Sequence, residues 1–278
     1  MTEYTSKQFW DSYYGKFKPH KVEKVVFADI FEKYLKSDSG KDILEIGCAG
    51  GDFLVYLAKR YHYKAFGVDY SDELWTTEEL SKFNDLPAPT LFKEDIFKWN
   101  PGRQFDIVCS FGFLEHFDDP SPVIKKHLEL LKPGGTLIIT MPHFAHLQYF
   151  FHWLIDRENL KKHNTKIMNL ESLRNALLNC HPEPACPVVN AERSTTGVEA
   201  SLSIQHLNYY RTFGFWVERP LASHPELVEG SLPLNLLERI IYHLIQFSGR
   251  VINKLLGLNH PNPLVSPHLI LIAQKQRG

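Results

Sequence analysis

The sequence predicts an α/β protein built on a doubly wound, mostly parallel sheet. Three observations carry this prediction. Short apolar runs alternate with amphipathic helical segments over residues 40–142, and such alternation calls for parallel strands joined by crossover helices. The first apolar run stops at the glycine-rich stretch LEIGCAGG of residues 44–51, and the second and third runs end in acidic residues. Loops after parallel strands meet at one edge of a sheet, where ligands bind.

The elements follow in order from the apolar periodicity. Residues 22–37 place Val25, Val26, Ile30, Phe31 and Leu35 on one face of an expected helix. The expected strands are KDILEIG (41–47), YKAFGVDYS (63–71), TLFKEDI (90–96), FDIVCSFGF (105–113) and GTLIITMP (135–142). Helices are expected at DFLVYLAKRY (52–61), SDELWTTEELSKF (71–83) and SPVIKKHLELLKP (121–133). Five strands are therefore accounted for by residue 142.

The second half of the chain is less regular. It holds an apolar aromatic segment at 143–155, a helix at 169–180 with Leu170, Leu173 and Leu177 on one face, and a final strand PHLILIAQK at 267–275. A long amphipathic helix is expected from Asn235 to Leu258. A membrane-surface role is one interpretation of this helix. Packing on the sheet is the favoured one, because most amphipathic helices bury their apolar stripe.

Two segments, 181–203 and 219–233, differ from the rest in composition. Both are rich in proline, serine and glutamate, and HPEP in the first echoes HPEL in the second. They lack clean periodicity, so we interpret them as loop insertions. A lid over a substrate is the alternative, since long loops sometimes serve as lids.

Composition and charge exclude several classes of partner. The 278 residues carry a net charge of −1 with a pI near 6.9, so there is no basic field for nucleic acid. Cys180, His181 and Cys186 do not match standard zinc spacings, and no metal is predicted. The N-terminus is polar and no apolar run reaches the roughly 18 residues of a spanning helix. We expect a cytoplasmic protein with at most peripheral membrane contact.

The residues around the glycine-rich stretch indicate which ligand it approaches. No lysine or arginine lies between Lys41 and Lys59, and a dinucleotide GxGxxG pattern fails because Ala49 and Asp52 stand at its second and third glycines. Glu45 and the strand-ending Asp69 and Asp95 are carboxylates. They suit a ligand that has hydroxyls, amines and positive charge but no phosphate. S-adenosylmethionine meets these requirements, and its carboxylate would be drawn to the helix start after the glycines.

Five motifs occur in the order and spacing of a known family. LEIGCAGGDF, FGVDYS, KEDI, FDIVCSFGFLEHFDDP and LKPGGTLIITMP cover residues 40–142. The chain thereby resembles the class I S-adenosylmethionine-dependent methyltransferases, especially the small-molecule branch of ubiquinone-biosynthesis-type O-methyltransferases. The resemblance implies a Rossmann-like sheet of seven strands with an antiparallel last strand, for which PHLILIAQK is the candidate. One departure is Ala49, where the family has glycine; its methyl group is harmless only if the local φ is negative.

The resemblance also implies a set of site residues and a division of the chain. Cofactor contacts are expected at Glu45, Gly47, Cys48, Ala49, Gly51, Asp69, Tyr70, Asp95, Ile96, Ser110 and Phe111. We expect one methyltransferase domain over 1–278, with cap helices at 1–40, the cofactor-binding core at 40–142 and substrate-side elements at 143–278. The aromatic segment FWDSYYGKF of residues 9–17 is expected to cover the cofactor pocket.

The expected activity is methyl transfer to a small-molecule, lipid or glycan acceptor, with oxygen as the favoured atom. His116 is the candidate general base, since an ordinary histidine pKa of about 6.5 suits that task. A structural role for His116 is the alternative, and His143 and His146 are the second candidates. Two other functions stay open: a catalytically inactive cofactor-binding partner subunit, and an enzyme linked to NAD or a nucleotide sugar.

Overall fold

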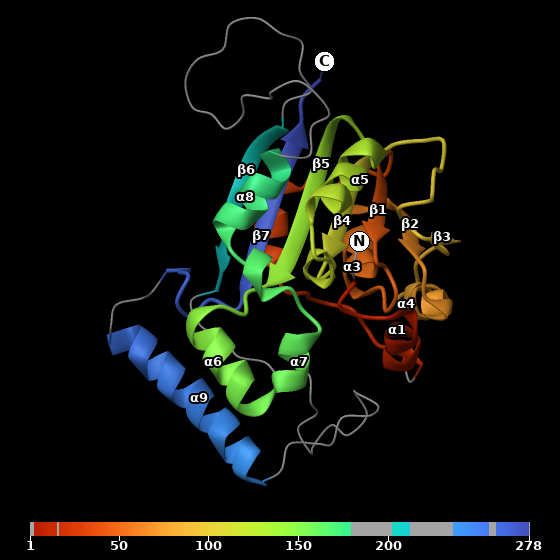
Figure 1. Ribbon diagram of the computed structural model, residues 1–278. Coiled ribbons are helices and arrows are strands. Elements are labelled where there is room, and N and C mark those ends of the chain that lie inside the picture. Colours follow the sequence, from red (N-terminus) through yellow and green to blue (C-terminus); the bar gives the residue numbers. More distant parts are fainter. Residues whose placement is uncertain (1–2, 16, 179–201, 212–235, 256–259, 278) are drawn as a thin grey trace, which may run out of the picture.

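In the computed structural model, one seven-stranded sheet lies between helices on its two faces (Figure 1). The structure describes all residues except 1–2, 16, 179–201, 212–235, 256–259 and 278. The strand order is β3-β2-β1-β4-β5-β7-β6. Strands β1 to β5 pair in parallel, whereas β7 is antiparallel to both β5 and β6. The predicted fold class is confirmed.

The bounds of the elements agree closely with the sequence periodicity in the first half of the chain. The strands are β1 Asp42–Ile46, β2 Lys64–Asp69, β3 Thr90–Lys93, β4 Phe105–Phe111, β5 Leu131–Pro142, β6 Leu202–Tyr210 and β7 His268–Lys275. The α-helices are α1 Lys7–Tyr14, α2 Ala28–Tyr34, α3 Asp52–Tyr61, α4 Trp75–Phe83, α5 Ser121–Leu130, α6 His146–Ile155, α7 Arg157–Lys161, α8 Leu170–Leu178 and α9 Leu236–Leu255. The 3₁₀ turns in the described part of the chain are η1 Asp72–Leu74, η2 Leu114–His116 and η3 Thr165–Ile167.

The core lies on both faces of the sheet because the central strands are apolar at successive positions. Ile43 packs with α2, α3 and α4 on one face, while Leu44 packs with α5 and α8 on the other. Ile138 and Ile139 divide between the same two faces. Since successive side chains of a strand point in opposite directions, such continuous apolar runs mark strands that are covered on both sides.

The far edge of the sheet is where sequence analysis was incomplete. The antiparallel strand predicted at 267–275 is confirmed as β7. Strand β6 was not identified, and its first two residues fall within the expected insertion 181–203. A register shift between Ile204 and His206 breaks the alternation of apolar and polar residues along β6, so the two-residue period that marks a strand is interrupted. Residues 181–201, which include His181 and Cys186, lie outside the described residues, as do Cys180 and the segment 219–233.

Two predicted elements are shorter than expected. The helix predicted over 22–37 is wrong before residue 28, because Phe27 adopts a left-handed conformation (φ 72°) and α2 begins only after it. Val22 lies in a segment without regular secondary structure, and its N–H donates to Asn84 Oδ1 over 2.8 Å. The third strand ends at Lys93, so Asp95 follows the strand instead of ending it. Asp95 Oδ1 accepts from the backbone N–H of Phe97 at 3.0 Å.

The prediction that the long helix packs on the sheet is wrong. Helix α9 packs against α6, through Ile241, Tyr242 and Ile245 on α9 and Phe151 and Ile155 on α6. Figure 1 shows α6, α7 and α9 beyond the lower end of β5, clear of both sheet faces. Among the described residues, no helix combines the length and apolar character needed to cross a membrane.

Candidate functional site

The glycine-rich stretch forms a tight loop between β1 and α3. Gly47 and Gly50 have φ values of 77° and 88°, which side chains rarely tolerate. A Cβ on Gly47 would lie 2.6 Å from the Phe113 ring, and one on Gly50 would lie 2.7 Å from Tyr14 Cε1. Ala49, by contrast, is not among the residues with positive φ. Its methyl group is therefore accommodated, as the sequence analysis required.

Asp69 connects this loop to the end of β2. Its Oδ2 accepts from the backbone N–H of Ala49 at 3.1 Å, and its Oδ1 accepts from the N–H of Ser71 at 2.8 Å. Burial raises the pKa of Asp69, against the lowering effect of these backbone donors. Each carboxylate oxygen can accept more than one hydrogen bond, so Asp69 can hold the loop and still bind ligand hydroxyls.

Glu45 adds a second acidic group beneath the loop. Its side chain is 4% exposed, and Oε2 has no hydrogen-bond partner among the described residues. Burial, reinforced by the nearby Asp52 and Asp69 carboxylates, raises the pKa of Glu45 well above its usual range. A cation bound here would offset that unfavourable burial of charge, because opposite charges favour the ionised form.

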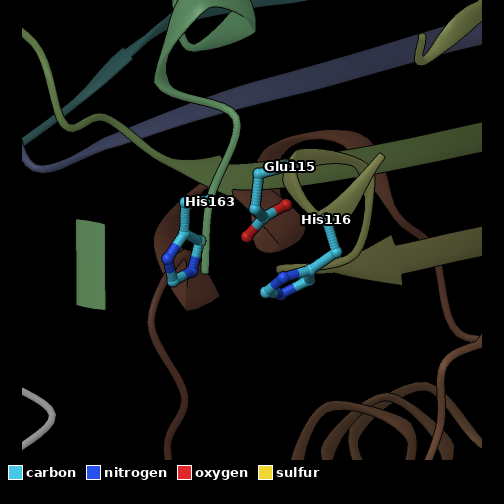
Figure 2. A group of neighbouring side chains, drawn as sticks. All are labelled: Glu115, His116 and His163. Atoms are coloured by element: carbon cyan, nitrogen blue, oxygen red, sulfur yellow. The ribbon is translucent and has the colours of Figure 1, made fainter. Parts of the chain in front are cut away.

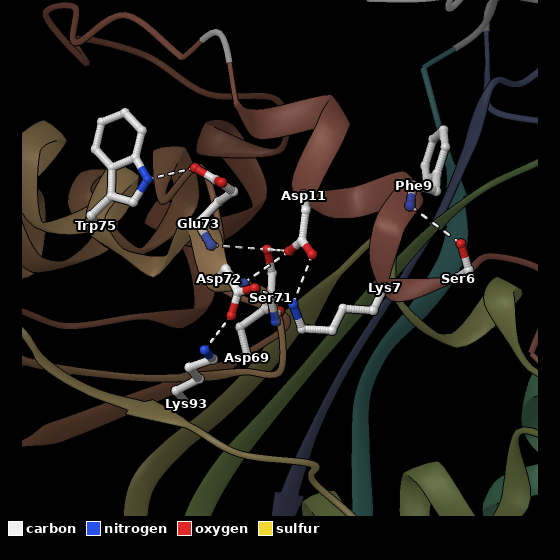
Figure 3. A network of polar contacts seen from close by, with 10 residues as sticks. All are labelled: Ser6, Lys7, Phe9, Asp11, Asp69, Ser71, Asp72, Glu73, Trp75 and Lys93. Carbon is white, nitrogen blue, oxygen red and sulfur yellow. Dashed lines mark hydrogen bonds and ion pairs between the residues drawn. The ribbon is translucent and has the colours of Figure 1, made fainter.

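Helix α1 lies over this region and is fastened to the end of β2 (Figure 3). Asp11 Oδ1 accepts from Ser71 Oγ at 2.8 Å and from the backbone N–H of Asp72 at 2.9 Å. Lys7 Nζ lies 2.7 Å from Asp11 Oδ2 and 2.6 Å from Asp72 Oδ2. Lys93 also pairs with Asp72. Ser71 follows Asp69 by two residues, so the same turn holds both the helix and the loop.

Three adjoining pockets open at the carboxyl ends of the parallel strands. The β2 pocket, about 720 Å³ in open volume, includes Gly47, Asp69, Tyr70, Asp95, Ile96 and Phe117 in its lining. The loop pocket includes Glu45, Gly47, Ala49, Gly51, Asp52 and Phe53. The β5 pocket includes Phe53, Met141, Pro142, Asn159, Lys162 and His163. Tyr14 of α1 and Phe111 of β4 line all three. Linings of this kind, mostly apolar with a few convergent polar groups, are typical of small-molecule sites.

Most of the predicted cofactor residues line the β2 pocket or the loop pocket, but two side chains do not. Cys48 is fully buried under the loop, and its carbonyl accepts from Thr77 Oγ1 at 2.6 Å. Ser110 is also fully buried, where its Oγ is 2.9 Å from His127 Nε2. Both residues lie in strand or loop positions that point into the core. Their side chains serve packing rather than the pocket surface.

His116 lies where the β2 pocket and the β5 pocket meet, since it lines both. Its Nδ1–H donates to the carbonyl of Lys162 at 2.9 Å, which leaves the lone pair on Nε2. Burial lowers the pKa of His116 to about 4. The ordinary value expected from the sequence is therefore wrong, and the imidazole is neutral at physiological pH.

Two further titratable groups stand beside His116 (Figure 2). The His163 ring centroid is 4.8 Å from that of His116, and His163 Nδ1–H donates to the Asn159 carbonyl at 2.6 Å. Burial raises the pKa of Glu115 to about 8, so its carboxyl group is protonated at neutral pH. Candidate ligand atoms of Glu115, His116 and His163 lie within 4.8 Å of one another, which makes these the residues that could hold a metal ion in the described part of the chain.

The alternative base candidates lie outside the three pockets. His143 is fully buried, and its Nδ1–H donates to the Ser266 carbonyl at 2.8 Å. Its ring contacts Tyr209, with centroids 4.8 Å apart. Neither His143 nor His146 is in the lining of these three pockets. His116 is therefore the one of the three predicted histidines that the fold brings to the site.

Sequence analysis missed several residues of the site. Glu115 adjoins His116 in the LEHF motif and could have been singled out on that ground. His163 lies 47 positions from His116 in a turn after α7, and only tertiary packing brings the two together. Asp11 carries no local signal either, because its partners belong to the turn after β2.

The arrangement of the sheet and the site defines a class I methyltransferase fold, and comparisons with known proteins agree. The chain matches the family described as "Methyltransferase domain" over residues 19–179, more than half of its length. It belongs to that family. The predicted class and its cofactor, S-adenosylmethionine, are thereby confirmed.

Curated relatives show the same class. The chain is 29% identical over 139 residues to the ubiquinone biosynthesis O-methyltransferase of Idiomarina loihiensis, covering 49% of this chain and 56% of that protein. It is 33% identical over 105 residues to the same-named enzyme of Methylococcus capsulatus, covering 37% and 44%. The chain thus spans about half the length of the curated relatives it matches.

Solved structures share the fold at low sequence identity. Magnesium protoporphyrin IX methyltransferase from Synechocystis, solved with bound S-adenosylhomocysteine, is 12% identical, with 96% of this chain and 94% of that chain covered and a TM-score of 0.51. A SAM-dependent methyltransferase from Archaeoglobus fulgidus is 16% identical, with 89% and 92% covered and a TM-score of 0.50. These similarities concern the fold alone.

Proposed function

We propose that the chain transfers a methyl group from S-adenosylmethionine to an oxygen atom of a small apolar or aromatic acceptor. The observation that carries the proposal is the junction at His116, where an acidic pocket at the end of β2 meets an aromatic pocket at the end of β5. Methyl transfer needs a donor site and an acceptor site whose reacting atoms approach in line. Two pockets that share a wall provide that arrangement.

In this proposal the cofactor spans the β2 pocket and the loop pocket. The ribose hydroxyls donate to Asp69, and the adenine lies among Ile96, Phe97 and Phe117. The methionine ammonium lies towards Glu45 in the loop pocket. The absence of lysine and arginine between Lys41 and Lys59 agrees with a ligand that has no phosphate. Helix α1 covers the cofactor through Trp10 and Tyr14, which line the β2 pocket.

The acceptor is proposed to occupy the β5 pocket. Aromatic side chains, including Phe9, Trp10 and Phe53, dominate its lining. Lys162 contributes a cation, and its Nζ lies 4.3 Å from the centroid of the Phe9 ring. Such a pocket suits a flat or hydrocarbon-rich acceptor. The names of the curated relatives specify O-methylation, which supports oxygen as the acceptor atom.

His116 acts as the proton acceptor in the proposed reaction. The acceptor oxygen attacks the methyl carbon, the bond from that carbon to sulfur breaks, and the hydroxyl proton passes to His116 Nε2. The products are the methyl ether and neutral S-adenosylhomocysteine. The donor is already activated, so positioning supplies most of the rate increase. A neutral imidazole held by the Lys162 carbonyl is ready to accept the proton at physiological pH.

Two measurements test the proposal. Calorimetry with S-adenosylmethionine, S-adenosylhomocysteine and NAD should show binding of the first two; preferential binding of NAD would overturn it. Formation of S-adenosylhomocysteine is then followed over a panel of phenols, amines and aliphatic alcohols. Methylation of a phenol or alcohol supports the proposal. Tight cofactor binding with methylation of amines alone rejects oxygen as the acceptor atom, and binding with no transfer to any acceptor favours a non-catalytic partner subunit.

A further inference from the structure

Exposed apolar side chains are concentrated on α6 and α9. The structure describes fourteen large apolar side chains as exposed, and ten of them lie on these two helices. Tyr149, Phe150, Trp153 and Leu154 are the members on α6; Leu236, Leu237, Ile240, Leu244, Phe247 and Val251 are those on α9. Isolated exposed apolar residues are ordinary, but a concentration of this kind marks a surface that meets another phase or molecule.

The exposed residues of α9 form a continuous stripe. Leu237, Ile240, Leu244, Phe247 and Val251 follow one another at spacings of three and four residues, which places them on one side of a helix. Phe247 is 69% exposed and Leu237 is 65% exposed. The stripe is therefore separate from the residues that pack on α6, and α9 is apolar on a second side as well.

Charge distinguishes this part of the molecule from the rest. Residues 146–167 contain the four cations Arg157, Lys161, Lys162 and Lys166 against two acids, and α9 contains the three cations Arg239, Arg250 and Lys254 against one acid. The two segments together carry a net charge of +4, whereas the whole chain carries −1. The remainder of the chain therefore sums to −5. One cation adjoins an exposed aromatic directly: the Arg157 guanidinium lies 4.4 Å from the centroid of the Trp153 ring.

We propose that the exposed surface of α6 and α9 docks on an anionic phospholipid bilayer. Exposed tryptophan, tyrosine and phenylalanine beside cations are typical of helices that lie at a membrane interface. Anionic headgroups complement the net positive charge of the two segments. A second copy of the chain would instead bring two positive surfaces together, which is unfavourable.

The position of the surface relative to the pockets gives the docking a consequence. Figure 1 shows α6, α7 and α9 beyond the end of β5 at which the strand arrow points. The pockets are at the same end of the sheet, and His163 and Lys162 of the β5 pocket directly follow α7. Docking through α6 and α9 therefore turns the pocket end of the sheet towards the lipid surface.

The test is co-sedimentation of the full chain with lipid vesicles. We expect binding to vesicles of phosphatidylcholine and phosphatidylglycerol in equal parts, weakening as salt is raised. Phe247→Ser together with Leu244→Ser should weaken binding by about tenfold or more for each side chain. A matched control replaces two exposed apolar residues of α4, Trp75→Ser with Phe83→Ser, and should bind as the wild type does. Lys161→Gln with Lys254→Gln should lose about fivefold per charge on these vesicles.

The outcomes separate this inference from the proposed methyl transfer. Affinity for S-adenosylhomocysteine, measured for every variant, reports folding and the cofactor site independently of lipid. The proposal is overturned if the wild type does not sediment with the anionic vesicles, or if the α9 variant and the α4 control bind equally. It is also overturned if ultracentrifugation finds a dimer that the α9 variant converts to a monomer, because a second copy then covers the surface.

Discussion

Replacing Asp69 by alanine tests the cofactor placement and the loop geometry together. In the structure Asp69 accepts from the backbone N–H groups of Ala49 and Ser71. The substitution removes the proposed ribose acceptor, which should cost about 1.5–3 kcal/mol of binding, typical of a hydrogen bond to a charged group. That range corresponds to a loss of roughly 10- to 150-fold in affinity. Calorimetric titration with S-adenosylhomocysteine measures it.

The same substitution should reduce stability, and the two effects can be distinguished. Two backbone donors lose their acceptor, at about 1–3 kcal/mol for each one that water does not reach. Glu32→Ala removes an exposed glutamate of α2 that pairs with Arg60 and should change neither quantity by more than about 0.5 kcal/mol. Unfolding by urea gives the stability of each variant. If Asp69→Ala lowers stability but leaves the affinity for S-adenosylhomocysteine unchanged, Asp69 only braces the loop, and the ribose placement is refuted.

Three further predictions follow from the buried titratable groups. His116→Ala should lower turnover by roughly 10²–10⁴-fold with cofactor affinity retained. Because the pKa of His116 is about 4, its titration should not change wild-type turnover near neutral pH. Unaltered turnover in the variant would show that His116 takes no part in the chemistry. The raised pKa of Glu45 predicts proton release and tighter S-adenosylmethionine binding as pH rises, because the ammonium favours the carboxylate; calorimetry in buffers of different ionisation heat should detect the release in the wild type and not in Glu45→Gln. Burial lowers the pKa of His127 from 6.5 to about 4. As pH falls, the unfolded state therefore binds a proton before the folded state does, and about 3 kcal/mol of the free energy of unfolding should be lost between pH 6.5 and pH 4. Urea unfolding across that range should show a smaller loss for His127→Asn.

The local sequence predicted the parts of the fold that depend on periodicity and turn chemistry. The apolar runs that form β1, β2, β4 and β5 contribute buried residues to the core. Gly47 and Gly50 mark a tight loop whose positive φ values favour glycine. The prediction of a helix over 22–37 failed because its apolar residues are buried by an irregular segment before Phe27 and by a helix after it. The apolar periodicity predicted which residues are buried, whereas tertiary packing decided whether their backbone is helical.

The sequence by itself determined the class of the protein, because the glycine loop, the acidic strand end at Asp69 and the LEHF motif are short stretches with local causes. Only the tertiary structure decided the environment of each group. His116 receives its low pKa from burial and its tautomer from the Lys162 carbonyl, 46 residues away. Asp11 fastens α1 to the turn after β2 across 60 residues. Helix α9 exposes a stripe that an amphipathic pattern alone would bury. Burial, charge proximity and exposure arise from contacts between distant segments, and no pattern within one segment encodes them.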